Sequence, residues 1–348
     1  MSVSGIATVA RQEFRLRIRA GRWKWLLAVF FLVLLGFTAL LRAALSQVSD
    51  EDLQFKGTVL YGGLMLFVLG LALLVVPALA AQSVNGDRER GTLATLQVTR
   101  LTAGEITLGK FTAAWGTALV FLALTLPLVG YAMTQNGVPL VRVVVLTLVL
   151  ALLLGAVCAI SLWWSAVLSR TTTSGVLAYI SVFALTIGTL IVFGLTTAVT
   201  AEQVTETYQN DCPPGTVEQG CVEGPMTYET TRARTDRTWW LLAPNPFVVL
   251  ADAAPQIPDG EQGLPVDEDF QVQASDLDPL GQIGQQVRNL RQEPGESDVY
   301  GSGSRDVTRP VWPTGLAIDV TLGVLALWLT ARRLRTPTRT LPKGQRVA

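Results

Sequence analysis

The most constraining feature of the sequence is a set of six long runs of mostly apolar residues. A helix needs roughly 20 such residues to cross roughly 30 Å of hydrocarbon. Hydrophobic residues make up 50% of the chain and charged residues only 16%, so we expect an all-α polytopic membrane protein. The six predicted transmembrane helices run from Trp25 to about Leu41, Thr58 to Ala81, about Phe111 to Met133, about Leu140 to Leu168, Gly175 to Thr200 and about Thr314 to Thr330.

The distribution of charge predicts which side of the membrane each connection faces, because short cytoplasmic connections are enriched in Lys and Arg. With both termini, residues 82–110 and residues 169–174 in the cytoplasm, that side holds 17 basic and 4 acidic residues. The other side then holds 22 acidic residues, 19 of them between Glu202 and Asp306. We therefore expect both termini inside. Only four of 27 basic residues are lysine, a composition that favours a bacterial protein and hence the bacterial cytoplasmic (inner) membrane.

These assignments divide the chain into five parts. The expected parts are an amphipathic interfacial helix (1–24), transmembrane helices one to five (25–200) with a cytoplasmic coupling loop (82–110), an extracytoplasmic domain inserted between helices five and six (201–313), transmembrane helix six (314–331) and a basic cytoplasmic tail (332–348).

The segment before the first span has apolar residues at helical spacing beside four arginines. Such a pattern predicts a helix in the inner interface, with its apolar face in lipid and its arginines on anionic headgroups. A solvated basic tail is the alternative. We expect the first span to be an uncleaved anchor, since the preceding basic region is longer than that of a signal peptide. The apolar face comprises Ile6, Val9, Ala10, Phe14 and Ile18, and the arginines are Arg11, Arg15, Arg19 and Arg22.

Histidine is absent and cysteine is rare. Without histidine, Ser-His-Asp and Cys-His catalysis and imidazole metal sites are excluded, so we expect no catalytic residue and no metal site in this chain. The charge balance also disfavours nucleic-acid binding. Cys212 and Cys221 lie in the outer segment, and we expect them to form a disulfide that staples a loop, with a redox switch as the less favoured role.

The loop between the second and third spans is the most informative stretch. Asn85-Gly86 predicts a turn, and Asp87 is placed to cap a short helix with Leu93 and Leu96 on one face. Thr102 and Glu105 have capping-box spacing and predict the start of a second helix that continues into span three. A charged end followed by an apolar ridge suits a helix lodged in a groove of a soluble partner, although a hairpin resting on the membrane fits the same pattern.

Residues Gly104 to Lys110 match the first part of a phosphate-binding loop, but the match fails at Phe111. A Ser or Thr is required there to bind magnesium, and the glycines should form a loop rather than continue a capped helix. We therefore expect no nucleotide site in this chain. Gly109 is better explained by close helix packing, and Lys110 by anchoring of span three at the inner interface.

The same loop resembles the first cytoplasmic loop of ABC-2-type transporter permeases. The resemblance rests on a charged run followed by Gly-Thr-Leu, on Leu108-Gly-Lys110, and on six spans with both ends inside. It implies that residues 82–101 dock on a separate ATPase subunit, which binds ATP and magnesium. It also implies that two permease subunits, identical or different, form an export pathway. The implied contact residues are Asp87, Arg88, Glu89, Arg90, Gly91, Thr92, Leu93 and Leu96.

Two further features are candidates for a role in the pathway or its gate. An apolar island in the outer segment should lie at the outer interface, either as a gate or as a packing anchor. Asp319 is the only acidic residue inside a predicted span, which makes it a functional candidate by default, although it lies close enough to the outer surface to reach interfacial water. The island residues singled out are Trp239, Trp240, Pro244, Pro246 and Phe247.

Taken together, the residues and the resemblance predict the permease subunit of an ATP-driven exporter that works by alternating access. The alternative is a non-transporting membrane sensor or assembly factor whose acidic ectodomain binds a ligand. A secondary transporter is disfavoured, because the two halves show no internal repeat and ionisable groups are lacking at the midplane.

Overall fold

The computed structural model describes residues 2–19, 21–46, 56–89, 91, 101–135, 137–210, 224–254, 278–291 and 310–335. Within these residues, six helical segments are long and apolar enough to cross a membrane. The chain is therefore a polytopic α-helical membrane protein, as predicted. The segments are Trp23–Leu45, Lys56–Glu89, Ala103–Met133, Leu140–Val167, Thr171–Val199 and Trp312–Arg333.

The helical bundle is built around one central helix, α8 (Leu140–Val167). Its side chains are apolar all round, which is the pattern of a helix surrounded by other helices or lipid. It contacts α3 (Lys56–Ala80), α6 (Ala103–Ala123), α9 (Thr171–Phe183) and α14 (Trp312–Arg333). The main core lies between these helices and α2 (Arg22–Leu45), which packs on α3.

Two of the spans are interrupted inside the apolar runs from which they were predicted, and the sequence did not predict these interruptions. Span three breaks after α6 and resumes as α7 (Leu126–Met133), with Pro127 in its first turn. Span five consists of α9, a π-helical turn η2 (Ala184–Gly188) and α10 (Thr189–Val199). In α9 and α10 the buried residues are few, namely Ser174, Ala178 and Thr197. Most of span five is therefore available to lipid or to another subunit.

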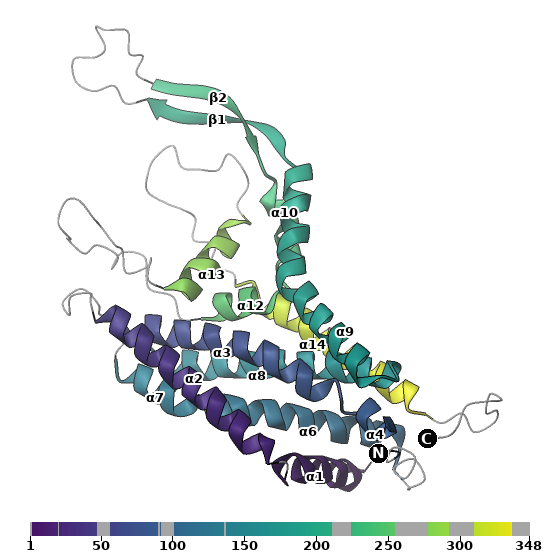
Figure 1. The fold of residues 1–348 in the computed structure, drawn as a ribbon. Helices are drawn as coiled ribbons and strands as arrows, with labels where there is room; N and C mark the ends of the chain where they lie inside the picture. Colours follow the sequence, from purple (N-terminus) through teal and green to yellow (C-terminus); the bar gives the residue numbers. More distant parts are fainter. Residues whose placement is uncertain are drawn as a thin grey trace.

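One end of the bundle carries α1 (Val3–Arg19), the short helix α4 (Asn85–Glu89) and the C-terminal end of α14 (Figure 1). Leu334, just after α14, packs in a small cluster with Val84 and Ile106. The segments that were predicted to be cytoplasmic therefore lie together.

The opposite end carries the outer segment, and part of it is β-structure. β1 (Glu202–Asn210) and β2 (Gly224–Arg232) form an antiparallel hairpin in which Glu202 is opposite Arg232. The hairpin extends beyond α10, away from the bundle (Figure 1). It is followed by α11 (Thr235–Thr238), the 3₁₀ turn η4 (Trp239–Leu241), α12 (Pro246–Ala253) and α13 (Pro279–Asn289). The predicted disulfide between Cys212 and Cys221 lies outside the described residues.

Candidate functional site

The predicted contact segment begins at α4. Within it, Asp87 is buried, Arg88 is half-buried and Glu89 is exposed. Gly91 is exposed and has φ of 70°, a left-handed conformation that favours glycine. The remaining predicted contact residues, Arg90, Thr92, Leu93 and Leu96, lie outside the described residues.

One local prediction for this loop is wrong, because Asn85 and Gly86 form the first turn of α4 rather than a separate turn. Asp87 is the third residue of α4, and the helix that it was predicted to cap, with Leu93 and Leu96, lies outside the described residues. The Asp87 carboxylate accepts a hydrogen bond from Lys110, 23 residues further along the chain. The turn and cap signals are local, whereas this ion pair is a tertiary contact.

Lys110 of α6 is the centre of a buried polar cluster. Its side chain is fully buried and is ion-paired with Asp87 of α4 and with Glu13 of α1. Its ammonium also donates to the carbonyl oxygen of Ser83 at 2.9 Å. Lys110 was predicted to anchor span three at the interface. In the structure it joins three segments instead, because a buried ammonium requires charged and polar partners.

α4 is also held by the junction between α8 and α9. The Ser165 hydroxyl accepts from the backbone amide of Val84 at 2.9 Å and donates to the Asn85 side chain at 2.9 Å. The Asn85 amide donates to the carbonyl of Arg170 at 3.2 Å. The exposed Glu89 accepts from the backbone amide of Thr171, the first residue of α9, at 3.1 Å. Displacement of α4 would therefore act directly on spans four and five.

α1 packs on α6 through part of the face that was predicted to lie in lipid: Val9 is buried there, whereas Ile18 on the same face is 46% exposed. Val9 is buried against Gly109, where an added Cβ would come within 2.5 Å of the Val9 Cβ. This contact supports the prediction that Gly109 permits close packing. The start of α6 has the predicted capping box between Thr102 and Glu105, and Arg17 donates to Thr117 on the same helix at 3.2 Å.

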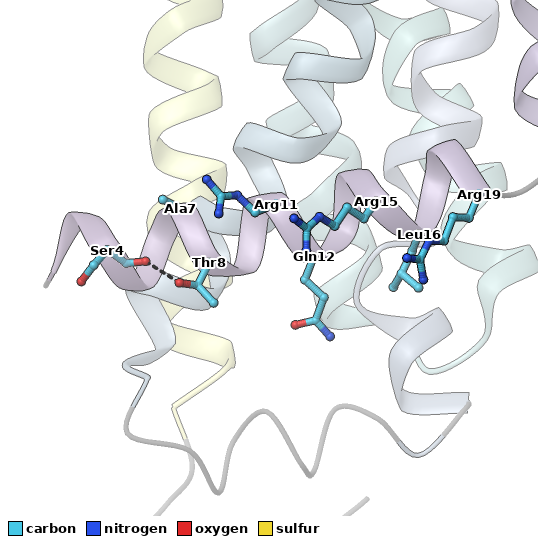
Figure 2. A pocket seen from close by; sticks show the side chains of 8 residues that line it. All are labelled: Ser4, Ala7, Thr8, Arg11, Gln12, Arg15, Leu16 and Arg19. Atoms are coloured by element: carbon cyan, nitrogen blue, oxygen red, sulfur yellow. Dashed lines mark hydrogen bonds between the residues drawn. The ribbon is translucent and has the colours of Figure 1, made fainter.

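The other face of α1 is exposed and basic. Figure 2 shows Arg11, Arg15 and Arg19 along this face, with Thr8 bonded to the Ser4 carbonyl at 2.8 Å. These residues line a hollow of about 630 Å³. Since the opposite face is fixed on α6, the arginines form a rigid row at the end of the bundle that carries α4.

The outer residues predicted as a gate or anchor lie on and beside α12. Trp240 is 57% exposed, whereas Trp239 is partly buried and its ring lies 4.8 Å below the guanidinium carbon of Arg291. Pro246 is the first residue of α12 and is buried, and Pro244 is half-buried. The half-buried Phe247 lines an apolar groove between α3 and span five. Phe247 is therefore placed against α3 and span five, and Trp239 packs in a cluster that includes Phe193 of span five.

Asn245, which the sequence analysis did not single out, fixes α12 on span five. Its side-chain oxygen Oδ1 caps α12 by accepting a hydrogen bond from the backbone amide of Phe247 at 2.9 Å. Its amide nitrogen donates to the Thr186 carbonyl at 2.7 Å and to the Thr189 hydroxyl at 2.9 Å. Thr186 lies inside the π-helical turn η2, a rare geometry that is found disproportionately at functional sites. An Asn before Pro predicts the cap, but nothing local predicts the partner in span five.

Asp252 is a second residue that sequence reasoning missed. Its carboxylate is fully buried and accepts hydrogen bonds from Arg288 of α13 at 2.5 Å and from the backbone amide of Trp312 at 2.8 Å. The amide of Val311 donates to the same carboxylate. One side chain thus joins α12, α13 and the start of α14. The sequence does contain a signal for such a residue, because Asp252 is a single acidic residue within an apolar stretch.

Asp319 lies on the face of α14 that packs on α8. It is 2% exposed, and neither carboxylate oxygen has a hydrogen-bond partner among the described residues. In this conformation Asp319 is therefore buried inside the chain and does not reach interfacial water, contrary to the prediction.

Two apolar grooves run along α3 and share Gly70 and Leu74. One, of about 510 Å³, lies beside α2, and the other, of about 530 Å³, lies beside span five. The Tyr179 hydroxyl donates to the Leu74 carbonyl at 2.6 Å within the second groove.

The sequence was compared with models of known protein families. The family described as "ABC-2 family transporter protein" matches residues 7–261, which include most of α1 and all of α4, the first five spans and α12. A search of curated proteins gave no significant match. The family match covers more than half of the chain and agrees with the six spans and the helical topology. The chain therefore belongs to the ABC-2 family of transporter proteins, whose members are the membrane-spanning, non-catalytic components of ABC transporters.

Proposed function

We propose that this chain is the permease subunit of an ATP-binding-cassette exporter, in which a separate ATPase subunit docks on α4 and the segment that follows it. The observation that carries the proposal is the attachment of α4 to four other elements. Lys110 links it to α6 and α1, Ser165 links it to α8, and Glu89 links it to α9. A displacement imposed on α4 by nucleotide-driven closure of the ATPase subunits would thus reach several spans at once.

The substrate pathway would form between two permease subunits, identical or different, and would change the side on which it opens. The weakly covered surface of span five and the two grooves along α3 support this part of the proposal, because a second subunit would bury them. Phe247 and Tyr179 would lie beside such a pathway. Asp319 lies in the packed interface of a single chain, so it would affect a gate rather than contact substrate in this conformation.

We place the chain in the bacterial cytoplasmic membrane with both termini in the cytoplasm. The supporting features are the basic residues at one end of the bundle, namely Arg11, Arg15 and Arg19 on α1 and Arg332 and Arg333 at the end of α14. Basic residues at the cytoplasmic ends of spans are the main determinant of orientation. ATP and magnesium would be bound by the partner subunit.

The test is to purify the chain with a candidate ATPase subunit and to measure assembly and ATP hydrolysis in vesicles. Glu89→Lys removes the acceptor for the Thr171 amide and places a cation at the N-terminus of α9, which the helix dipole disfavours. Gly91→Pro is incompatible with φ of 70°. We expect either change to lower hydrolysis or assembly by about tenfold or more. Glu89→Gln keeps an acceptor for Thr171 and serves as the matched control.

Unchanged assembly and turnover in both Glu89→Lys and Gly91→Pro would contradict docking at α4. If no ATPase subunit associates with the chain at all, and deletion of residues 203–310 abolishes function, the sensor or assembly-factor alternative is favoured instead.

A further inference from the structure

The face of α14 that packs on α8 consists mainly of small residues with one acid among them. The buried residues of α14 recur every three or four positions, which places them in one row. Small residues let helix backbones approach closely. A Cβ added at Gly323 would lie 3.1 Å from the Cα of Ala156, and one at Gly315 would lie 2.0 Å from the Ala243 carbonyl oxygen. The row is Gly315, Asp319, Gly323, Ala326 and Thr330.

Asp319 is enclosed by this packing within a single chain. At 2% exposure it is out of reach of lipid, a second subunit or substrate unless α14 separates from its neighbours. Its two oxygens have no hydrogen-bond donor in the part of the chain that the structure describes. An ionised carboxylate without a partner in such surroundings is strongly disfavoured relative to the neutral acid.

The elements packed on α14 are α6, α8 and α12, and none of their ionisable groups neutralises Asp319. Lys110 is ion-paired with Glu13 and Asp87, and Asp252 is paired with Arg288. Among the described residues, no group of three His, Cys, Asp or Glu side chains could hold a metal ion. The remaining ionisable groups on these elements are Glu105 on α6 and Arg142 and Cys158 on α8. α14 itself carries Arg332 and Arg333 at its far end. None of these groups forms an ion pair with Asp319.

We propose that Asp319 is a proton-binding site that couples the packing of α14 on α8 to pH. The carboxyl group takes up one proton from water when the helices pack and returns it to water when they separate and the carboxylate is hydrated. No other reactant is required. This inference concerns one chain and does not depend on where an ATPase subunit docks.

The direction of the effect follows from linkage. The packed state binds the proton, so acid favours packing, and raising the pH favours separation of α14 from α8. One proton per chain changes the packing equilibrium by up to about tenfold per pH unit, between the pKa values of the separated and the packed states.

The test compares the wild-type chain with Asp319→Asn, a neutral residue of nearly the same shape. Thermal unfolding in lipid nanodiscs is measured from about pH 5 to about pH 9. We expect the wild-type midpoint to fall, relative to that of Asp319→Asn, as the pH rises. Asp319→Leu provides a second neutral variant should the asparagine chain fold poorly.

Infrared spectroscopy gives an independent readout of the proton itself. Because Asp278 is a second buried carboxyl, the spectra are compared in the Asp278→Asn background. At neutral pH, this chain should show the carbonyl stretch of a protonated carboxylic acid, and adding Asp319→Asn should remove it. Glu202→Gln is the matched control, because the Glu202 carboxylate is 49% exposed and ion-paired with Arg234, so its removal should leave that band in place. Absence of the band while Asp319 is present, its persistence after Asp319→Asn in the Asp278→Asn background, or parallel pH profiles of the wild type and Asp319→Asn would each overturn the proposal.

Discussion

The ammonium of Lys110 on α6 is ion-paired with the carboxylate of Asp87 on α4, and both side chains are buried. Glu13 of α1 is ion-paired with the same ammonium. Among the described residues, the ion pairs of this cluster join one cation to two anions, and the three come from three separate segments. Removing the cation would leave two carboxylates with little access to water.

Lys110→Met is therefore expected to destabilise the protein by about 3 kcal/mol, because breaking a buried ion pair on one side leaves uncompensated charge. The measurement is thermal unfolding of the purified chain in detergent. The triple variant Lys110→Met, Glu13→Gln, Asp87→Asn carries no net charge at the cluster and should recover part of the loss. A stability of Lys110→Met equal to the wild type would show that the cluster is not the link between α1, α4 and α6.

Gly109→Ala should displace α1 from α6. The added Cβ would lie 2.5 Å from the Val9 Cβ and 3.1 Å from the Ile6 carbonyl oxygen, and overpacking of this kind typically costs about 1–3 kcal/mol. Faster amide hydrogen exchange across residues 3–19 would report the displacement. Gly116→Ala is the matched control on the same helix, since an added Cβ there meets nothing within 4 Å. Equal exchange in the two variants would argue against the close contact.

Asp252→Asn should release α13 and the start of α14. The amide cannot replace the carboxylate as acceptor for Arg288, Val311 and Trp312 together, so we expect a loss of about 3 kcal/mol. Hydrogen exchange in residues 279–289 should rise before global unfolding. Glu202→Gln breaks the contacts of an acid that is 49% exposed and should cost less than about 1 kcal/mol. A larger effect of Glu202→Gln than of Asp252→Asn would contradict this ranking.

Asp278, directly before α13, should make the docking of this helix sensitive to pH. The residue is buried, and its carboxylate lies at Gly62 of α3. Burial raises the pKa of the Asp278 carboxyl above its ordinary value. A raised pKa means that the packed state holds the proton more tightly, so this contribution to stability is complete in acid and is lost as the pH rises above about 4.

The check on Asp278 is the difference in unfolding midpoint between wild type and Asp278→Asn at each pH. We expect the wild type to lose stability relative to the variant as the pH is raised toward neutrality. A constant difference across the pH range would mean that Asp278 is already ionised when α13 is docked.

Features that depend on neighbouring residues were predictable from the sequence. Each span is visible as an apolar run, because the hydrocarbon core fixes the length of helix needed to cross it. The capping box of Thr102 and Glu105 was predictable because its two hydrogen bonds join residues three apart. The hairpin was missed, although Val204, Tyr208 and the threonines of β1 and β2 favour strands, because neither strand has a continuous apolar face.

The identities of the polar partners were decided only by the tertiary structure. Lys110 and Glu13 are separated by 97 residues, and Asn245 and Thr186 by 59, so no local pattern connects them. An isolated charge or amide in an apolar run shows that a partner is required, since burying it alone is costly. Which residue meets that requirement depends on how the helices pack, and for Asp319 the packing provides no partner among the described residues.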